Sequence, residues 1–190
     1  MCLMKLRTKV LAVLIILNCC SSCKSDVHMA SIPIISWGGI PANKADTLFC
    51  LARECGFDTH LGLYRSMGNA IASMDAAARA GMGVIVGFPQ IKDSTDLAVS
   101  LIKDHPALFA YHLKDDPDTS DFGRLGDLSE KIHKSDPSHP CYINLLPNWA
   151  WGVEEYSDKM DSFASQIDVP FYSFDNYPII EVDGLILQYQ

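Results

Sequence analysis

The chain has 190 residues and a formal net charge of −8 at pH 7, and its first 22 residues hold three basic and no acidic side chains. Without that segment 168 residues remain with a net charge of −11, which argues against a nucleic-acid partner. A chain of this length can bury a substantial core and fits one domain.

The N-terminal segment has the pattern of an export signal. Basic residues precede an apolar run over residues 10–17, which is too short to span a bilayer, and a Cys/Ser cluster follows. Cys23 follows a small residue and resembles a bacterial lipoprotein junction, so we expect lipidation of Cys23 and anchoring to the outer membrane. An ordinary secretory signal or an uncleaved anchor is the alternative. The expected organisation is a signal peptide over 1–22, a tether over 23–31 and a domain over 32–190.

Apolar runs of strand length alternate with helix-period segments along the rest of the chain. The expected strands are residues 32–38, 59–64, 83–88, 108–113, 141–146 and 171–174. Such alternation is typical of parallel βα units. No Gly-rich phosphate motif follows the first strand, which favours a barrel over a doubly wound sheet. We therefore predict an α/β fold, a TIM-type (β/α) barrel that is incomplete, with about six of its units. Residues 181–190 are expected to trail beyond the sixth strand.

Helix boundaries and cysteines give further expectations. Gly56, Gly81 and Pro137 fall just past the ends of expected helices, where a left-handed cap or a stop is common. Cys50 and Cys55 lie five residues apart on an expected helix, without zinc-ligand spacing nearby. A disulfide framework and a metal site are therefore not expected, and we predict buried thiols.

Residues that follow parallel strands meet at one end of a barrel and form its large concave site. The chain places aromatic, amide and carboxylate side chains there. The candidate substrate-binding residues are Trp37, Tyr64, His112, Asp115, Asn144, Asn148, Trp149 and Tyr177, and the candidate catalytic residues are Asp116 and Asp175. Aromatic rings stack on sugar faces and amides and carboxylates bind hydroxyls, so this set suits an oligosaccharide or polysaccharide.

Each candidate also has a structural interpretation. The sequence Asp116-Pro117 is typical of a turn, and Asp115 or Asp116 could cap the helix expected to begin near Phe122. Trp149 could pack over the barrel rim, and Asp175 could form a turn before a proline. Because His112 alternates with Tyr111, one of these two side chains should point into the barrel.

Three motifs resemble a known family. They are Tyr-His-Leu-Lys-Asp-Asp-Pro at 111–117, Cys-Tyr-Ile-Asn-Leu-Leu-Pro-Asn at 141–148 and Ser-Phe-Asp-Asn-Tyr-Pro at 173–178. Together they resemble exported glycoside hydrolase-like lipoproteins of gut Bacteroidetes, relatives of the retaining (β/α)8 glycosidases. Those proteins often read Asp-Glu-Pro, Tyr-x-Asn-Leu-x-Pro-Asn and Asp-x-Tyr-Pro at strands four, five and six. The resemblance covers most of residues 32–180.

The resemblance implies roles for individual residues. Asp116 stands where the family has its general acid/base glutamate, and Asp115 where the preceding aspartate lies. The positions that match substrate-pocket residues are Asn144, Asn148, Asp175 and Tyr177. Asp116 is one methylene shorter than glutamate. The clan's nucleophile comes from a seventh strand, which the expected pattern of six strands does not include. Asp175 is the other carboxylate that can approach the substrate. It would attack the anomeric carbon or position the substrate.

The leading hypothesis is hydrolysis of glycosidic bonds by paired carboxylates, without a cofactor. One alternative is a carbohydrate-binding lipoprotein without catalysis. Another is metal-dependent hydrolysis by Asp115, Asp116 and a histidine, although the usual ligand spacing is not seen. A last alternative is an inactive fragment, because an open six-stranded barrel exposes two edges and part of its apolar interior.

Overall fold

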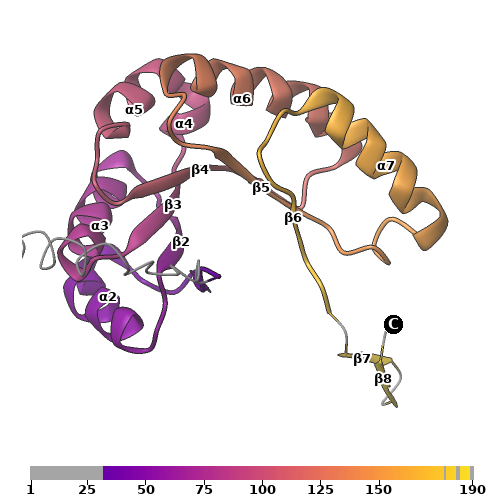
Figure 1. Ribbon diagram of the computed structural model, residues 1–190, viewed down its shortest axis with the longest axis horizontal. Coiled ribbons are helices and arrows are strands. Elements are labelled where there is room, and N and C mark those ends of the chain that lie inside the picture. Colours follow the sequence, from indigo (N-terminus) through magenta and orange to yellow (C-terminus); the bar gives the residue numbers. More distant parts are fainter. Residues whose placement is uncertain (1–31, 178, 183–184, 189–190) are drawn as a thin grey trace, which may run out of the picture. The chain divides into compact units, whose positions relative to one another are not determined.

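The computed structural model describes residues 32–177, 179–182 and 185–188. Six parallel strands form one curled sheet in the order β1-β2-β3-β4-β5-β6, so every strand pairs with its neighbours in sequence (Figure 1). The strands are β1 (Ile35–Trp37), β2 (Thr59–Leu63), β3 (Gly83–Gly87), β4 (Leu108–Asp115), β5 (Cys141–Leu145) and β6 (Ser173–Phe174). The α/β fold is that of an incomplete TIM-type barrel, as the alternating pattern predicts.

Helical segments fill the connections between these strands. They are η1 (Ala42–Lys44), α2 (Ala45–Glu54), α3 (Met67–Ala80), α4 (Gln90–Asp93), α5 (Thr95–Ile102), η2 (Thr119–Asp121), α6 (Phe122–Ser135) and α7 (Val153–Gln166). The α6 helix begins at the expected residue. Gly81 caps α3 in the left-handed conformation with φ 68°, and Gly56, just beyond α2, has φ 92°. The sequence therefore located these helix ends correctly.

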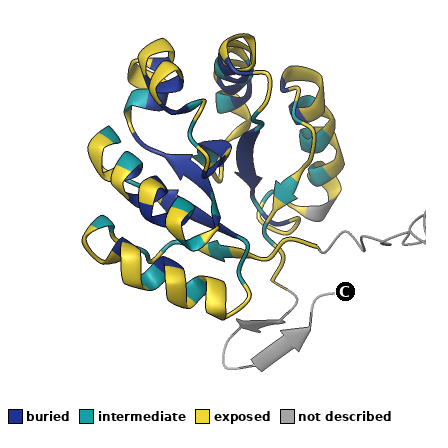
Figure 2. Cartoon of the chain, turned by 60° about the vertical axis from the view of Figure 1, so that its left-hand side comes forward, coloured by how far each residue is buried: buried dark blue, intermediate teal, exposed yellow. Residues whose placement is uncertain are grey.

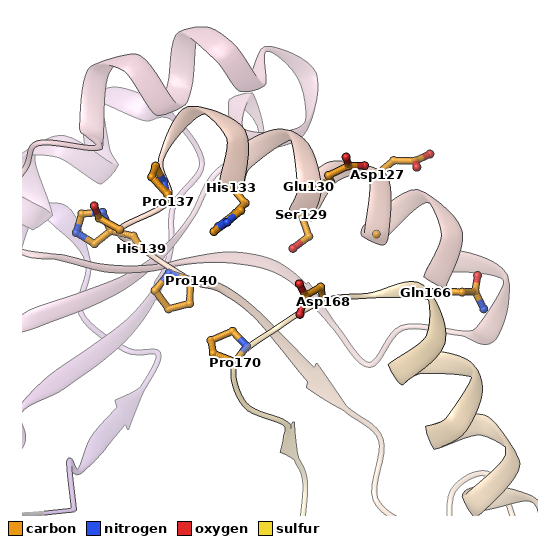
Figure 3. Close-up of a pocket in the computed structure, with 12 residues that line it drawn as sticks. Asp127, Ser129, Glu130, His133, Pro137, His139, Pro140, Gln166, Asp168 and Pro170 are labelled. Atoms are coloured by element: carbon orange, nitrogen blue, oxygen red, sulfur yellow. The ribbon is translucent and has the colours of Figure 1, made fainter.

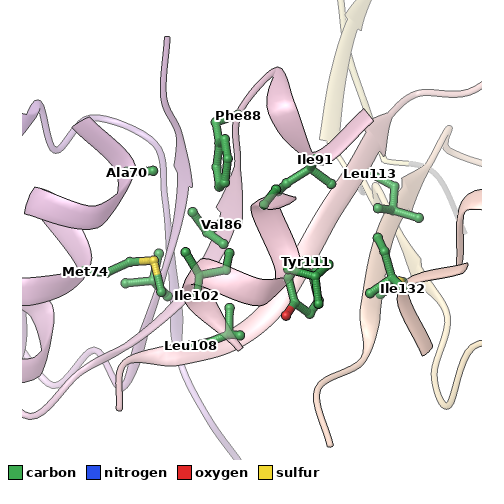
Figure 4. Packing of buried hydrophobic residues seen from close by; sticks show 14 of the residues in the cluster. Ala70, Met74, Val86, Phe88, Ile91, Ile102, Leu108, Tyr111, Leu113 and Ile132 are labelled. Atoms are coloured by element: carbon green, nitrogen blue, oxygen red, sulfur yellow. The ribbon is translucent and has the colours of Figure 1, made fainter. Parts of the chain in front are cut away.

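The main hydrophobic core lies between the helices and the outer face of the sheet. In Figure 4, apolar side chains of α3, α5 and α6 meet those of β3 and β4. Leu61, Ile85, Ala110 and Tyr142 form a separate small cluster on the opposite, inner face. The strands in the middle of the sheet are almost wholly buried, whereas the helices keep an exposed outer side (Figure 2). Burial on both faces explains why these strands read as continuous apolar runs.

A shift in register changes the faces that the end of β4 presents. His112 pairs with Tyr142, but the next pairs are Lys114 with Ile143 and Asp115 with Asn144. Leu113 is thus an extra residue in β4, a β-bulge. Strict alternation would place Lys114, not Asp115, on the face of His112. The bulge reverses this, so Asp115 lies beside Asn144 on the inner face.

The two outermost strands are shorter than the sequence predicts. Strand β1 covers three residues and β6 two, and within the described sheet each pairs with one neighbour. Trp37 and Phe174, the last residues of these edge strands, are 52% and 54% exposed. The expected exposure of both edges is therefore present in the described residues.

The structure adds one element to the expected fold and shows that the expected burial of two thiols is wrong. Residues expected to trail after β6 instead include an antiparallel hairpin of β7 (Ile179–Val182) and β8 (Leu185–Gln188). The intervening sequence Asp183-Gly184 is a hairpin signal that the barrel pattern obscured. Cys50 and Cys55 are exposed, and only Cys141 among the described cysteines is buried. Phe49 and Ala45 take the buried stripe of α2, which turns Cys50 toward solvent.

The expected signal peptide and Cys23 lie outside the described residues. Among the helices that the structure describes, none combines the length and apolar character needed to cross a bilayer.

Candidate functional site

The carboxyl ends of β4, β5 and β6 bring polar side chains together, and we call this end of the sheet the mouth. Asn144 is buried at its centre. Its amide nitrogen donates to Asp115 Oδ1 at 3.1 Å and to Asp175 Oδ1 at 2.9 Å. Its amide oxygen accepts from Ser173 Oγ at 2.8 Å. One buried amide thus links carboxylates from β4 and from the segment after β6, which supports the expectation that these residues share one site.

Asp116 lies directly after β4 and has an unusual backbone. Its φ of 49° is in the left-handed region, and it is the one non-glycine residue with positive φ among those described. The Asp116 amide donates to the Asn144 carbonyl oxygen at 3.0 Å, which fixes the turn. Conformations of this kind cost free energy and cluster at functional sites.

The electrostatics of the mouth disfavour ionisation of Asp116. Partial desolvation of this exposed side chain, then the negative charges of Asp115 and Asp175, raise the pKa of the Asp116 carboxyl above its ordinary value of 3.8. Both neighbouring carboxylates therefore act on Asp116. A carboxyl that keeps its proton to higher pH is suited to proton donation.

Asp175 and Tyr177 form the outer side of the mouth. The Asp175 amide donates to the Leu145 carbonyl oxygen at 3.0 Å, which holds the segment after β6 against β5. The Tyr177 hydroxyl donates to Asp175 Oδ2 at 3.0 Å, and this bond raises the pKa of Tyr177. The Tyr177 ring lies 6.4 Å from that of Trp149, and both rings are exposed. The two aromatic candidates thus form one surface beside a carboxylate with two donors.

Below the mouth, aromatic rings line the inner face of the sheet. The Tyr142 ring lies 6.0 Å from His112 and 6.5 Å from Trp37. His112 is the side chain that points inward, whereas Tyr111 faces the helices. Burial lowers the pKa of His112 to about 4, so its ring is neutral near pH 7. His112 Nε2 is buried and has no hydrogen-bond partner among the described residues.

Two candidates stand apart from this group. The Tyr64 ring folds back over Gly62 and packs against the core on the helix side of the sheet. Its hydroxyl is buried, so Tyr64 does not reach the mouth. Asn148 lies exposed in the turn after β5, next to Trp149, and is not part of the Asn144 network. The other eight of the ten candidates lie at the mouth or on the inner face below it. They are Trp37, His112, Asp115, Asp116, Asn144, Trp149, Asp175 and Tyr177, with Trp37 at the far edge of the inner face.

Sequence reasoning missed Tyr142 and Ser173. The Tyr142 hydroxyl bonds Ser173 Oγ at 2.8 Å, and Ser173 in turn donates to Asn144. Tyr142 lies two residues before Asn144 on β5, so the period of a strand could have placed both on one face. No sequence signal marks Ser173, because its role depends on the register between β5 and β6.

The turn and capping interpretation can be compared directly with the structure. Asp118 and Asp121 form a capping box that begins η2 and leads into α6. Asp115 and Asp116 do not cap this helix. Lys114 and Arg124 form ion pairs with Asp121, at 3.7 Å for the Lys114 Nζ to Asp121 Oδ2 distance. Asp115 and Asp116 are thus left for other interactions.

The opposite end of the sheet holds a cavity of about 560 Å³. It lies between α6, the segment before β5 and the segment between α7 and β6 (Figure 3). Asp136 borders this region. It accepts hydrogen bonds from the Tyr111 hydroxyl at 2.7 Å and the Ser138 amide at 3.0 Å, and it contacts His139 Nδ1 at 2.7 Å. Sequence reasoning did not anticipate this buried network.

Within residues 32–177 and the two hairpin strands, no group of three or more His, Cys, Asp or Glu side chains is arranged to hold a metal ion.

No family model matches the chain, and no curated protein matches it. Among solved structures, the chain is similar to an uncharacterised protein from Parabacteroides distasonis, with 10% identity and a TM-score of 0.40. That match covers 70% of this chain and 69% of the other.

Proposed function

We propose that this protein is a glycoside hydrolase-like protein that acts on a glycan at the mouth. The observation that carries the proposal is the Asn144 bridge, which holds Asp115 and Asp175 on one amide beside Asp116. Hydrolysis of a glycosidic bond needs one protonated and one ionised carboxyl group that flank the bond. The mouth supplies candidates for both.

Asp116 is the proposed general acid. It donates its proton to the glycosidic oxygen while the bond from that oxygen to the anomeric carbon breaks, and the leaving sugar departs with a free hydroxyl. Asp175 attacks the anomeric carbon or positions the water that does. The raised pKa of Asp116 suits the first role. The donors on Asp175, Asn144 and Tyr177, orient its carboxylate for the second.

The exposed rings of Trp149 and Tyr177 are the proposed sugar platform. They stand beside Asp175, so a sugar that stacks on them has its hydroxyls near carboxylate oxygens. A sugar face buries apolar C–H groups against such rings, while its hydroxyls need the acceptors that the mouth provides. Trp37, on the inner face, is a more distant aromatic candidate.

The proposal includes the cell envelope as location. The N-terminal sequence pattern and Cys23 support an exported lipoprotein, anchored by lipid to the outer membrane at its periplasmic face or at the cell surface. Replacement of Cys23 by alanine in the producing cell should release the protein from membranes. Membrane fractionation measures this release, with a globomycin-type inhibitor of lipoprotein processing as a second test of the wild type.

The experiment for catalysis is digestion of a panel of plant and host glycans, with reducing ends as the readout. We expect cleavage by the wild-type chain and its loss in Asp116→Ala. Asp118→Ala is the matched control, because Asp118 is a nearby exposed aspartate that caps η2. Absence of cleavage across the panel, or cleavage that survives Asp116→Ala, would reject catalysis by this residue.

A second candidate is glycan binding without catalysis. The Trp149–Tyr177 surface favours it, because exposed aromatic rings bind sugars whether or not an acid lies nearby. This function predicts retention of glycans without new reducing ends. Binding should be lost in Trp149→Ala and kept in Asp116→Ala, which distinguishes a binding protein from an enzyme.

A further inference from the structure

Tyr142, Ser173 and Asn144 form a chain of hydrogen bonds that runs from the inner face of the sheet to the mouth, and we call these three residues the relay. The Tyr142 hydroxyl lies 2.8 Å from Ser173 Oγ, and Ser173 Oγ lies 2.8 Å from Asn144 Oδ1. From Asn144 Nδ2 the chain continues to Asp115 at 3.1 Å and to Asp175 at 2.9 Å. The relay thus connects an aromatic side chain of β5 with two carboxylates of the mouth.

The direction of every bond in the relay follows from the number of protons available. The Asn144 nitrogen donates to two carboxylates, which uses both of its hydrogens, and the Asn144 oxygen accepts the one hydroxyl proton of Ser173. Ser173 then has no proton left to give to Tyr142. The Tyr142 hydroxyl must therefore donate to Ser173, so all donors of the relay point toward the mouth. Hydrogen bonds aligned in this way polarise and strengthen one another.

The backbone holds Asp175 only lightly. Strand β6 has two residues and, within the described sheet, pairs with β5 alone. Just beyond it, the Asp175 amide bonds the Leu145 carbonyl oxygen at 3.0 Å. Tyr177, which also donates to the Asp175 carboxylate, is itself exposed. Segments with few buried contacts open readily, so the bonds from Asn144 and Ser173 add an anchor that the short edge strand needs.

The other end of the relay is firmly fixed. Tyr142 is 5% exposed and belongs to the small apolar cluster on the inner face. Its ring lies 6.0 Å from the His112 ring and 6.1 Å from the Phe171 ring. The packed ring leaves the hydroxyl at one place, beside Ser173. The relay therefore ties a lightly held carboxylate to a buried side chain of a fully buried strand.

We propose that Tyr142 and Ser173 are positioning residues, which hold the Asp175 carboxylate at the mouth through Asn144. This inference rests on the proposed function, in which Asp175 attacks the anomeric carbon or positions the water that does. For this role neither Tyr142 nor Ser173 touches the substrate. A reacting group displaced by about 1 Å can lose about a hundredfold in rate, so a partial loss of orientation is large enough to measure.

Kinetics of the full chain on a glycan that it cleaves test this role. Ser173→Ala should lower kcat about tenfold and leave KM within about twofold, because Asp175 acts in the chemical step. Ser173→Thr keeps a hydroxyl and should restore most of the rate. Tyr172→Phe is the matched control. It removes a hydroxyl from the neighbouring residue, whose exposed ring lies 5.9 Å from Phe163 on the helix side, and it should leave kcat unchanged.

A double-variant cycle distinguishes a relay from two independent contacts. Tyr142→Phe keeps the packed ring and removes the proton with which the relay begins, and it should lower kcat less than Ser173→Ala does. Because that proton acts only through Ser173, the double variant should be no slower than Ser173→Ala alone. Losses that multiply would show that the two hydroxyls act separately, and they would overturn the relay.

Titration of Asp116, followed by carbon NMR of the aspartate carboxyls, needs no substrate. The negative charges of Asp115 and Asp175 contribute to the raised pKa of Asp116. In Ser173→Ala the pKa of Asp116 should fall toward its ordinary value of 3.8 as Asp175 loses its place, and in Tyr172→Phe it should not change. An unchanged pKa in Ser173→Ala would overturn the positioning role. A wild type that cleaves no glycan would contradict the proposed catalysis, whereas this titration would still decide the positioning.

Discussion

The two ends of the sheet use the same kinds of side chain in opposite ways. At the amino end, Asp136 is buried, and Tyr111, His139 and Ser138 occupy its oxygens. At the mouth, Asp116 is exposed and lies among like charges. Burial opposes ionisation of Asp136, but hydrogen bonds from Tyr111 and His139 outweigh it and lower its pKa. The pKa of Asp116 is raised instead.

This difference separates structural carboxylates from candidate functional ones. A carboxylate whose partners all come from its own protein stabilises the fold and has no capacity left for a ligand. A carboxylate with unfavourable neighbours costs some stability but can transfer a proton or bind hydroxyls. In parallel barrels the same division holds between the amino and carboxyl ends of the strands. The following substitutions test this contrast.

Asp136→Ala should give the largest effect. It leaves the buried Tyr111 hydroxyl and His139 Nδ1 without their partner, and we expect a loss of about 3 kcal/mol in the free energy of unfolding. Urea denaturation at pH 7 measures it. Asp127→Ala, an exposed aspartate of α6, is the control and should change stability by less than about 0.5 kcal/mol.

The Asp136 effect should depend on pH with a defined sign. Because the pKa is lowered in the folded state, the stabilisation is present above the ordinary value of 3.8 and is lost as the pH falls through the folded pKa. The stability difference between the wild type and Asp136→Asn should therefore shrink below about pH 4. A difference that stays constant down to pH 2 would show that hydrogen bonds to the ionised form are not its source.

Gly126→Ala should have the next largest effect. A Cβ at Gly126 would overlap the backbone oxygen of Gln166, so α6 or the end of α7 must move, at a cost of about 2 kcal/mol. Gly123, one turn earlier, offers a matched control, since its Cβ would lie 3.6 Å from Gln166 Oε1. Gly123→Ala should stabilise the protein by up to about 1 kcal/mol, because alanine favours helix. Similar thermal shifts for both variants would contradict the close packing.

Asn144→Ala should cost less than Asp136→Ala although both side chains are buried. It removes the bonds to Asp115 and Asp175, but these carboxylates reach water and can be hydrated. We expect a loss of about 1.5 kcal/mol by urea denaturation. A loss as large as that of Asp136→Ala would mean that the mouth is as closed as the amino end, and the contrast between the two ends would fail.

Asp116→Asn should give the smallest change and the opposite sign. It removes a charge disfavoured by Asp115 and Asp175, and asparagine tolerates the left-handed backbone. We expect a gain of a few tenths of a kcal/mol at pH 7, since solvent screens an exposed carboxylate. The part of this gain that comes from the charge should vanish at low pH, where the Asp116 carboxyl is protonated in both the folded and the unfolded state. Loss of stability at pH 7 would assign Asp116 a structural role.

Local sequence signals predicted much of the fold. The alternation of apolar runs and helix periods predicts six parallel strands with helices between them, and Gly81 and Gly56 mark helix ends because few other residues adopt positive φ without strain. The helical period of apolar residues also predicts the start of α6 near Phe122. The ends of parallel strands must meet, so Asp116, Asn144 and Asp175 could be assigned to one end before any contact was known.

Tertiary structure alone decided how these residues meet. Period-two alternation would have put Lys114 beside His112, but the bulge at Leu113 places Asp115 there and turns Lys114 toward Asp121. The Tyr64 ring turned back to the helix side, and Ser173 joined the network through the register of β5 and β6. Sequence patterns encode which faces are apolar, since this depends on neighbouring residues. Register, bulges and shared hydrogen bonds depend on residues about thirty positions apart, whose pairing only the folded chain fixes.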